Sequence, residues 1–388
     1  MNEARQMHDH LVNALLPIIP RTIYQDRRRL DTLVWAIVGL CLTQTVHFPA
    51  WAEMTQSRAR SAASRERRFS RWLHHRSIVP MQWYRPVLQS ALIDWPVDQR
   101  LFVALDTTAL LPFVLIRASL VYRGRAISLA WRALRHQSTQ VSFEAYQPVL
   151  DQVRAIIPPG MVITLLADRG FAHERLLHYL HQQRWHFRLR LPGNTLVHLS
   201  AQSVAAVKDL CPPPGQDRFF QGVSILGVAV GPVHLALSCQ LEQPDDPWFV
   251  VSDEPTTAQT LDEYGLRFDI EESFRDEKSG GYQIHLSHLA QPEALERLLL
   301  ILALATLYLT SLGVSVEKAD KRRWVDPHWQ RRLSYMQLGW RWRRQQASRG
   351  WQAFVPFWLD PAPDPLPMLT LPRGVIRESH EVDLSAVA

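Results

Sequence analysis

The sequence predicts an α/β protein built on one mixed sheet, with helical regions before and after it. Apolar residues recur at helical spacing through about the first 95 residues, and from Leu101 the pattern changes to short apolar runs that follow one another closely. Runs of this length, bounded by turn residues, are typical of buried strands. A long apolar helical segment after the strands completes the pattern.

Residues 1–98 are predicted to form a helical region. Helical spacing is clear in LDTLVWAIVGLCL and again in MQWYRPVLQSALIDW. Between them, the segment from Arg58 to Arg76 carries seven arginines interleaved with Phe69 and Trp72. Arginines around aromatic residues on a helix are typical of a nucleic-acid surface, so this helical region is predicted to bind DNA. An ordinary solvated basic helix is the alternative, and no helix-turn-helix is established.

Residues 99–193 are predicted to form the first part of the central core. Three strands come first (LFVALD, LPFVLIRASLVY and RAISLAW), and the last two join through a tight turn at Tyr122–Arg125. A helix over Ser142–Ile157 then ends at two prolines and a glycine. A strand ending at Asp168, a helix over His173–Arg184 and the strand WHFRLRL follow. Three antiparallel strands, a helix, a strand, a helix and a strand are the order of a ribonuclease H-like fold.

A β-rich insertion is predicted over residues 194–255, where short apolar strands alternate with proline- and aspartate-rich turns. The second part of the core follows over residues 256–315 and includes the apolar stretch Leu298–Leu312. That stretch has about 15 residues, whereas a membrane span needs about 20. A buried core helix is therefore expected, and no membrane association.

Residues 316–388 are predicted to form a helical C-terminal region with a tail. The sequences KRRW at 321–324 and WRWRR at 340–344 interleave basic residues with tryptophan. Such a pattern suits contact with DNA or protein, and a subunit interface is an equal alternative. The last 30 or so residues, rich in proline and then polar, are expected to be poorly ordered.

Composition limits the class of protein. The sequence pI of about 9.4 and the formal charge of +6 are compatible with a polyanionic partner without requiring one. Three cysteines lie far apart with no CxxC pair, which argues against a zinc module or a disulfide framework and fits a cytoplasmic protein. No signal peptide is visible. The chain has no GK dipeptide, so a P-loop is excluded and no ATP requirement is expected.

Three acidic residues are candidate metal ligands. Asp106 and Asp168 each follow an apolar strand, where a rigid sheet can direct the side chain into a cleft. Glu271 lies in the helix-like segment YGLRFDIEESFRDEK. An aspartate at a strand end is more often a turn former or a helix cap, and a solvated, salt-bridged helix face is the alternative for the glutamate.

Helical geometry distinguishes this glutamate from its neighbour. At roughly 100° per residue, one face of a helix would carry four residues that lie within about 60° of one another around the helix axis. They are Tyr264, Arg267, Glu271 and Lys278. Glu272 is about 100° further round. One carboxylate among two cations and a phenol suits a metal ligand whose neighbours bind phosphate. Carboxylate oxygens are the ligands that hard divalent ions prefer, so the three carboxylates are candidate ligands of a metal site.

The spacing tyrosine, two residues, arginine, three residues, glutamate, six residues, lysine resembles the signature of one branch of bacterial insertion-sequence DDE transposases, the family numbered four. The residues that match it are Tyr264, Arg267, Glu271 and Lys278. ALDTT around Asp106 and ADRGF around Asp168 resemble the two aspartate motifs of the same family. The resemblance extends over about residues 100–310.

This resemblance implies a ribonuclease H-like fold with an insertion before the glutamate helix, and the chemistry of a cut-and-paste transposase. On this resemblance, water would nick the end of the element, the freed 3′-hydroxyl would make a hairpin, and the resolved end would attack target DNA. Because such steps need an activated oxygen and a stabilised leaving oxygen, Asp106, Asp168 and Glu271 are expected to hold two Mg²⁺ ions about 3.5–4 Å apart, with Asp106 bridging both and Mn²⁺ able to substitute. It also implies that Tyr264, Arg267 and Lys278 contact phosphates of the transposon end. A dimer acting on double-stranded DNA at two terminal repeats, associated with the bacterial nucleoid, is implied as well.

The sequence leaves alternatives for the roles of two further residues and for the function of the protein. Arg190 is a candidate for the same phosphate contacts, with a surface strand residue as the alternative. Trp248 is a candidate for stacking on a displaced base, and a core tryptophan is the more common case. A domesticated or inactive descendant would bind DNA without cutting it. A resolvase or other nuclease on this fold would cut branched DNA instead.

Overall fold

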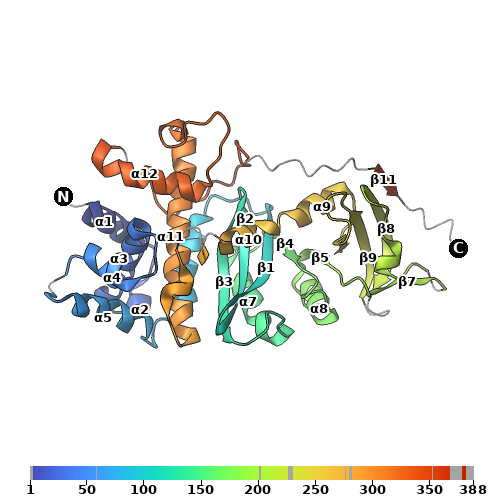
Figure 1. The fold of residues 1–388 in the computed structure, drawn as a ribbon, viewed down its shortest axis with the longest axis horizontal. Helices are drawn as coiled ribbons and strands as arrows, with labels where there is room; N and C mark the ends of the chain where they lie inside the picture. Colours follow the sequence, from blue (N-terminus) through green and yellow to red (C-terminus); the bar gives the residue numbers. More distant parts are fainter. Residues whose placement is uncertain are drawn as a thin grey trace.

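The computed structural model describes residues 3–57, 59–200, 202–225, 230–275, 277–278, 282–351, 353–367 and 378–381. Figure 1 shows an elongated molecule with helices at the N-terminal end, a sheet in the middle and a β-rich part at the other end. Arg58 of the predicted basic segment lies outside the described residues. So do residues 368–377 and 382–388 of the C-terminal tail.

The N-terminal region is helical, and its core is the apolar helix α3 (Arg27–Thr43). Asp26 caps α3 by accepting a hydrogen bond from the Arg28 backbone, and Ser61 caps α5 in the same way. This region packs against the long helix α11. The helices are α1 (Glu3–Leu15), α2 (Arg21–Tyr24), α3, α4 (Phe48–Met54), α5 (Ala62–Leu73) and α6 (Pro80–Ala91).

The central sheet confirms the predicted ribonuclease H-like order. Its first five strands lie in the order β3-β2-β1-β4-β5, with the first three antiparallel and β4 and β5 parallel to β1. Helices α7, α10 and α11 pack on the sheet. The strands are β1 (Arg100–Leu110), β2 (Phe113–Tyr122), β3 (Arg125–Arg135), β4 (Val162–Ala167) and β5 (His186–Arg190), and the crossover helices are α7 (Phe143–Ile156) and α8 (Glu174–Gln183).

The β-rich insertion extends the same sheet. Strand β10 pairs antiparallel with β5, so that Val250 lies opposite Arg190, and β9, β8, β6 and β7 continue the order. A short strand near the C-terminus, β11 (Glu378–Glu381), pairs with β8. The bounds are β6 (Leu196–His198), β7 (Val204–Ala206), η1 (Val207–Leu210), β8 (Gln216–Ile225), β9 (Val230–Cys239) and β10 (Trp248–Ser252).

The chain leaves the sheet through α9 (Ala258–Gly265), α10 (Phe268–Arg275) and η3 (Ile284–Ser287), and then forms α11 (Pro292–Lys318). By length and composition α11 could span a membrane, with a mean hydropathy of 2.1, but 89% of that window is buried inside the protein. The bent pair α3–α4 passes the same test of composition. The burial of α11 agrees with the predicted core helix.

After α11 come η4 (Arg322–Trp324) and α12 (Tyr335–Arg349). The tryptophans of this basic region differ in burial. Trp342 is fully buried and its ring centroid lies 4.4 Å from that of Trp351. Trp329, by contrast, is 80% exposed. Packing therefore accounts for part of the tryptophan-rich pattern that the sequence offered as a DNA or protein contact.

Helices α11 and α12 approach each other closely at two glycines. A Cβ on Gly313 would lie 1.9 Å from the backbone oxygen of Tyr335, and one on Gly339 would lie 1.9 Å from that of Leu309. We expect Gly313→Ala to lower the free energy of unfolding by about 1–3 kcal/mol, because the helices must separate. Thermal denaturation measures this. Gly170→Ala is the control, since a Cβ there meets nothing within 4 Å. Equal midpoints for the two variants would contradict the prediction.

Candidate active site

The two predicted aspartates lie side by side on neighbouring parallel strands. Asp168 follows the end of β4, but the prediction that the first strand ends at Asp106 is wrong, because β1 pairs with β2 as far as Leu110. Leu105 of β1 is paired with Ala167 of β4, so the next residues along the two strands are Asp106 and Asp168. The Asp106 side chain is only 17% exposed, and its Oδ1 accepts a hydrogen bond of 2.8 Å from the Thr107 backbone. Oδ1 of Asp168 is buried and has no hydrogen-bond partner. Parallel pairing thus brings together two carboxylates that are far apart in the sequence.

The glutamate segment is not one continuous helix, so the prediction of a single helix from Tyr264 to Lys278 is wrong. Helix α9 ends at Gly265 and α10 begins at Phe268. Across the break the hydrogen bonds join residues three apart, with the Arg267 N–H donating to Tyr264 O at 3.0 Å. Such tighter turns are common where one helix gives way to another. Tyr264 and Glu271 are therefore in different helices, and the common face that ideal helical spacing predicted does not include Tyr264.

Arg267, in the break, lies between two of the carboxylates. Its guanidinium donates to Glu271 Oε1 at 2.8 Å and to Asp106 Oδ2 at 3.3 Å, and its side chain is only 6% exposed. Although burial opposes the charge, Tyr264 and these carboxylates raise the pKa of Arg267. Asp168 contributes to the same effect. All three predicted carboxylates are therefore near one buried guanidinium.

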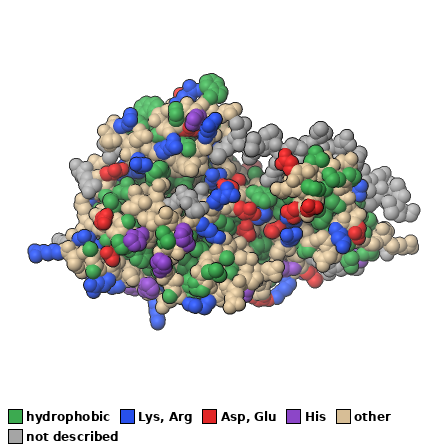
Figure 2. Space-filling model, in the orientation of Figure 1, with side chains coloured by type: hydrophobic (Ala, Val, Ile, Leu, Met, Phe, Trp, Pro, Cys, Tyr) green, Lys and Arg blue, Asp and Glu red, His purple; other side chains and the backbone are tan. Residues whose placement is uncertain are grey.

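The two adjacent glutamates have different surroundings. Glu271 is half exposed and bonded to Arg267, whereas Glu272 forms an ion pair of 2.8 Å with Arg275. The Glu271 side chain therefore reaches the aspartates' end of the sheet, where Figure 2 shows acidic side chains gathered over the α9–α10 segment with Lys and Arg beside them.

Tyr264 is fully buried and lies in a small core with Trp248, whose ring centroid is 5.1 Å away. Burial is the main reason that the pKa of Tyr264 rises to about 12, with Arg267 opposing and Asp168 reinforcing the shift. Trp248 is itself only 5% exposed, as the core alternative expected. Tyr264 therefore borders the site from the protein interior and not from the solvent side.

Arg190 and Lys278 also lie next to the aspartates. Arg190, at the end of β5, is buried, so the surface alternative is wrong for it. It lies 3.9 Å from Asp168 Oδ1 and forms an ion pair with Asp246. Lys278 donates from Nζ to Thr108 Oγ1 at 2.6 Å, and burial lowers its pKa. Thr108 is in β1, two residues beyond Asp106.

The carboxylates fit divalent cations in both donor type and electrostatics. Burial, reinforced by the charges of Glu271 and Asp168 and opposed by Arg267, raises the pKa of Asp106 to about 6. Oδ1 of Asp168, which accepts no hydrogen bond and lies 3.9 Å from Arg190, is a further buried acceptor at the site. Carboxylate oxygens are the ligands that hard divalent ions prefer.

Among the described residues, one group of three potential ligands has atoms within 4.8 Å of one another, and it does not consist of these three carboxylates.

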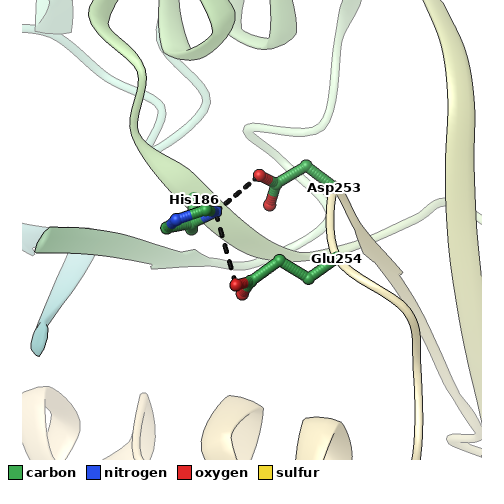
Figure 3. Close-up of side chains that lie close together, drawn as sticks. All are labelled: His186, Asp253 and Glu254. Atoms are coloured by element: carbon green, nitrogen blue, oxygen red, sulfur yellow. Dashed lines mark hydrogen bonds and ion pairs between the residues drawn. The ribbon is translucent and has the colours of Figure 1, made fainter.

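The tighter cluster consists of His186, Asp253 and Glu254 (Figure 3). The histidine Nδ1 is 2.7 Å from Asp253 and 3.7 Å from Glu254. Arg100 and Arg188 each donate to Glu254 at 2.7 Å, and hydrogen bonding to Arg100 is the largest cause that lowers its pKa to about 2.

Two guanidiniums already neutralise this cluster, so it is better explained as an ion-pair network that joins the starts of β1 and β5 to the end of β10. It lies at the opposite end of β1 from Asp106. The sequence does not predict this cluster, because its members come from separate segments and form no motif.

Part of the chain is similar to a known protein family. Residues 141–308 match the family model described as a transposase DDE domain. The matched span includes Asp168 and Glu271, and Asp106 precedes it. No curated protein matches the chain. Among solved structures, a piggyBac transposase synaptic complex with hairpin DNA, studied by cryo-electron microscopy, is similar with a TM-score of 0.45 and 11% identity, over 87% of this chain and 79% of that chain.

Proposed function

We propose that this chain, part of which matches a transposase DDE domain, is a DDE transposase. In it, Asp106, Asp168 and Glu271 hold two Mg²⁺ ions, and the enzyme cuts double-stranded DNA at the ends of a mobile element. The observation that carries the proposal is the meeting of these three carboxylates at one end of a ribonuclease H-like sheet, around the single guanidinium of Arg267. DDE transposases as a class depend on divalent metal ions, and Mg²⁺ is the specific assignment made here.

The bound ions would activate the attacking oxygen and stabilise the leaving one. The chain's own residues bind and position the DNA. Arg267, which is paired with Asp106 and Glu271, contacts the scissile phosphate. Lys278, which is bonded to Thr108 two residues beyond Asp106, contacts a second phosphate. Arg190, next to Asp168, is placed for a third.

We assign buried Tyr264 a different role from the phosphate contact that the family signature implies. Its ring lies beneath Arg267, whose guanidinium is 5.9 Å from the ring centroid. The tyrosine therefore positions Arg267 instead of touching DNA. Phe268 lies closer still to the guanidinium, at 4.6 Å, and restricts it from another side.

The wider proposal follows the family resemblance of the signature. The enzyme belongs to the branch numbered four, makes a hairpin at each end, and joins the released ends to target DNA. Because two ends must be cut and joined together, a homodimer acts on the pair of terminal repeats. The protein acts at the bacterial nucleoid.

Metal-dependent cleavage tests the proposal. Purified protein and labelled duplexes carrying the inverted repeats that flank the gene should give nicked and hairpin products with Mg²⁺. EDTA should reduce the products to background, and added Mg²⁺ should restore them, because the carboxylates need the ions to bind the reacting phosphate. Denaturing gels separate nicks from hairpins. Specific binding without any cutting in Mg²⁺ or Mn²⁺ would identify an inactive, DNA-binding descendant instead.

A further inference from the structure

A groove beside Lys278 has no role in the chemistry described above. It encloses a volume of about 710 Å³, within the usual range for ligand sites. The tip of the β1–β2 hairpin forms one wall, and the η3 segment with the start of α11 forms the other. Lys278 lines the groove and bonds to Thr108 of β1. The groove is therefore continuous with the aspartates' end of the sheet.

The ionisable side chains that line the groove are basic. Its described lining residues include four with basic side chains, namely Arg135, Lys278, His285 and His288, and none with a carboxylate. Arg135 is fixed by a hydrogen bond of 2.8 Å to Ala290 O and lies 5.6 Å from the centre of the Phe113 ring. His285 Nδ1 is 3.0 Å from Lys278 O. A polyanion is the partner that such a set of donors would attract.

The remaining lining is apolar. Ile284 and Leu295 are buried at the base, and Leu111, at the hairpin tip, is 82% exposed. Apolar surface beneath basic side chains suits a chain that has flat apolar faces as well as phosphates, which describes a nucleic-acid strand. A small inorganic anion would make no use of the apolar walls.

We propose that this groove holds a stretch of DNA strand adjoining the phosphate that is cut, with the backbone along Arg135 and His288 and a base against Leu111. The inference rests on the proposed function, since it takes Lys278 as the point where the strand leaves the carboxylates. It adds a DNA contact region to the protein that is separate from the three carboxylates.

Paired substitutions at exposed Leu111 test the groove without disturbing the core. In a protein carrying Asp168→Asn, which binds DNA without cutting it, Leu111→Glu should weaken DNA binding about tenfold, whereas Leu111→Gln should weaken it less, because the two differ only in charge. Arg135→Gln should reduce the slope of log K against log salt by about one. Arg154→Gln, on α7 and exposed, is the control for loss of one positive charge.

The DNA used makes the test specific. Duplexes are shortened stepwise from either side of the cleavage position, and affinities are measured by fluorescence anisotropy. The groove variants should differ from Arg154→Gln on full-length DNA and match it once the strand that fills the groove is removed. Losses that are independent of DNA length on both sides, or no larger than the control's, would overturn the proposal. These binding results decide the groove even if the wild-type protein cuts no DNA, which would instead count against the proposed function.

Discussion

Glu271→Gln is expected to reduce cleavage of element ends by at least about a hundredfold while leaving their binding nearly unchanged. The neutral amide keeps the shape of the side chain but removes a charged metal ligand. A bound ion contributes several kcal/mol of transition-state stabilisation, and each 1.4 kcal/mol corresponds to about a factor of ten in rate. Single-turnover cleavage with Mg²⁺ measures the effect, and a gel-shift assay measures binding.

Glu272→Gln is the matched control for this prediction, because it makes the same chemical change one residue away. Glu272 is paired with Arg275 and away from Arg267. Exposed ion pairs contribute about 0–1 kcal/mol, so stability and cleavage should remain close to wild type. Normal cutting by Glu271→Gln together with loss of cutting by Glu272→Gln would reverse the assignment of the two glutamates. Equal loss in both would point to disruption of α10.

The order of elements could be predicted because it depends on local pattern. The residues before Asp106 and Asp168 are mostly apolar, as is typical of strands covered on both faces, and this gives a strong signal. Parallel pairing of β1 and β4 then places the aspartates together without any long-range information beyond strand order. The fold and the position of the two aspartates on neighbouring strands could therefore be predicted from the sequence.

The features that were missed depend on contacts between distant segments. The break at Leu266–Arg267 lies in a run with good helical spacing, and tertiary packing of Tyr264 against Trp248 overrides that spacing. The pairing of β10 with β5, which joins the insertion to the central sheet, has no signal within either strand. The burial of Arg190 is a consequence of that pairing.

The ion pair between Arg117 and Glu277 is another contact of this kind, and it connects the sheet to the end of the glutamate segment. Arg117 lies directly opposite Asp106 in the β1–β2 pair, and opposed residues share a face of the sheet. Its guanidinium binds both oxygens of Glu277, at 2.9 and 2.6 Å, and stacks 4.8 Å from the Phe274 ring centre. The side chains are 2% and 10% exposed. The pair therefore positions Lys278 and the end of α10 beside the aspartates.

Glu277→Gln should lower the free energy of unfolding by about 3–5 kcal/mol, because it leaves the Arg117 charge buried without its partner. For a chain of this size we expect the thermal midpoint to fall by roughly 5–10 °C. Below that midpoint, cleavage should also slow, because Glu271 and Lys278 lose their fixed position relative to Asp106. Differential scanning calorimetry and single-turnover cleavage provide the two measurements.

The double variant Arg117→Met/Glu277→Leu separates burial of an unpaired charge from loss of the connection itself. It removes both charges, so most of the lost stability should return, as is common when a buried ion pair is replaced by apolar residues. Cleavage should recover less than stability, since a flexible apolar contact does not fix Lys278 as a bidentate ion pair does. If the double variant were as unstable as Glu277→Gln, the buried charge would not be the cause. If it cut DNA like wild type, the ion pair would have no role in positioning α10.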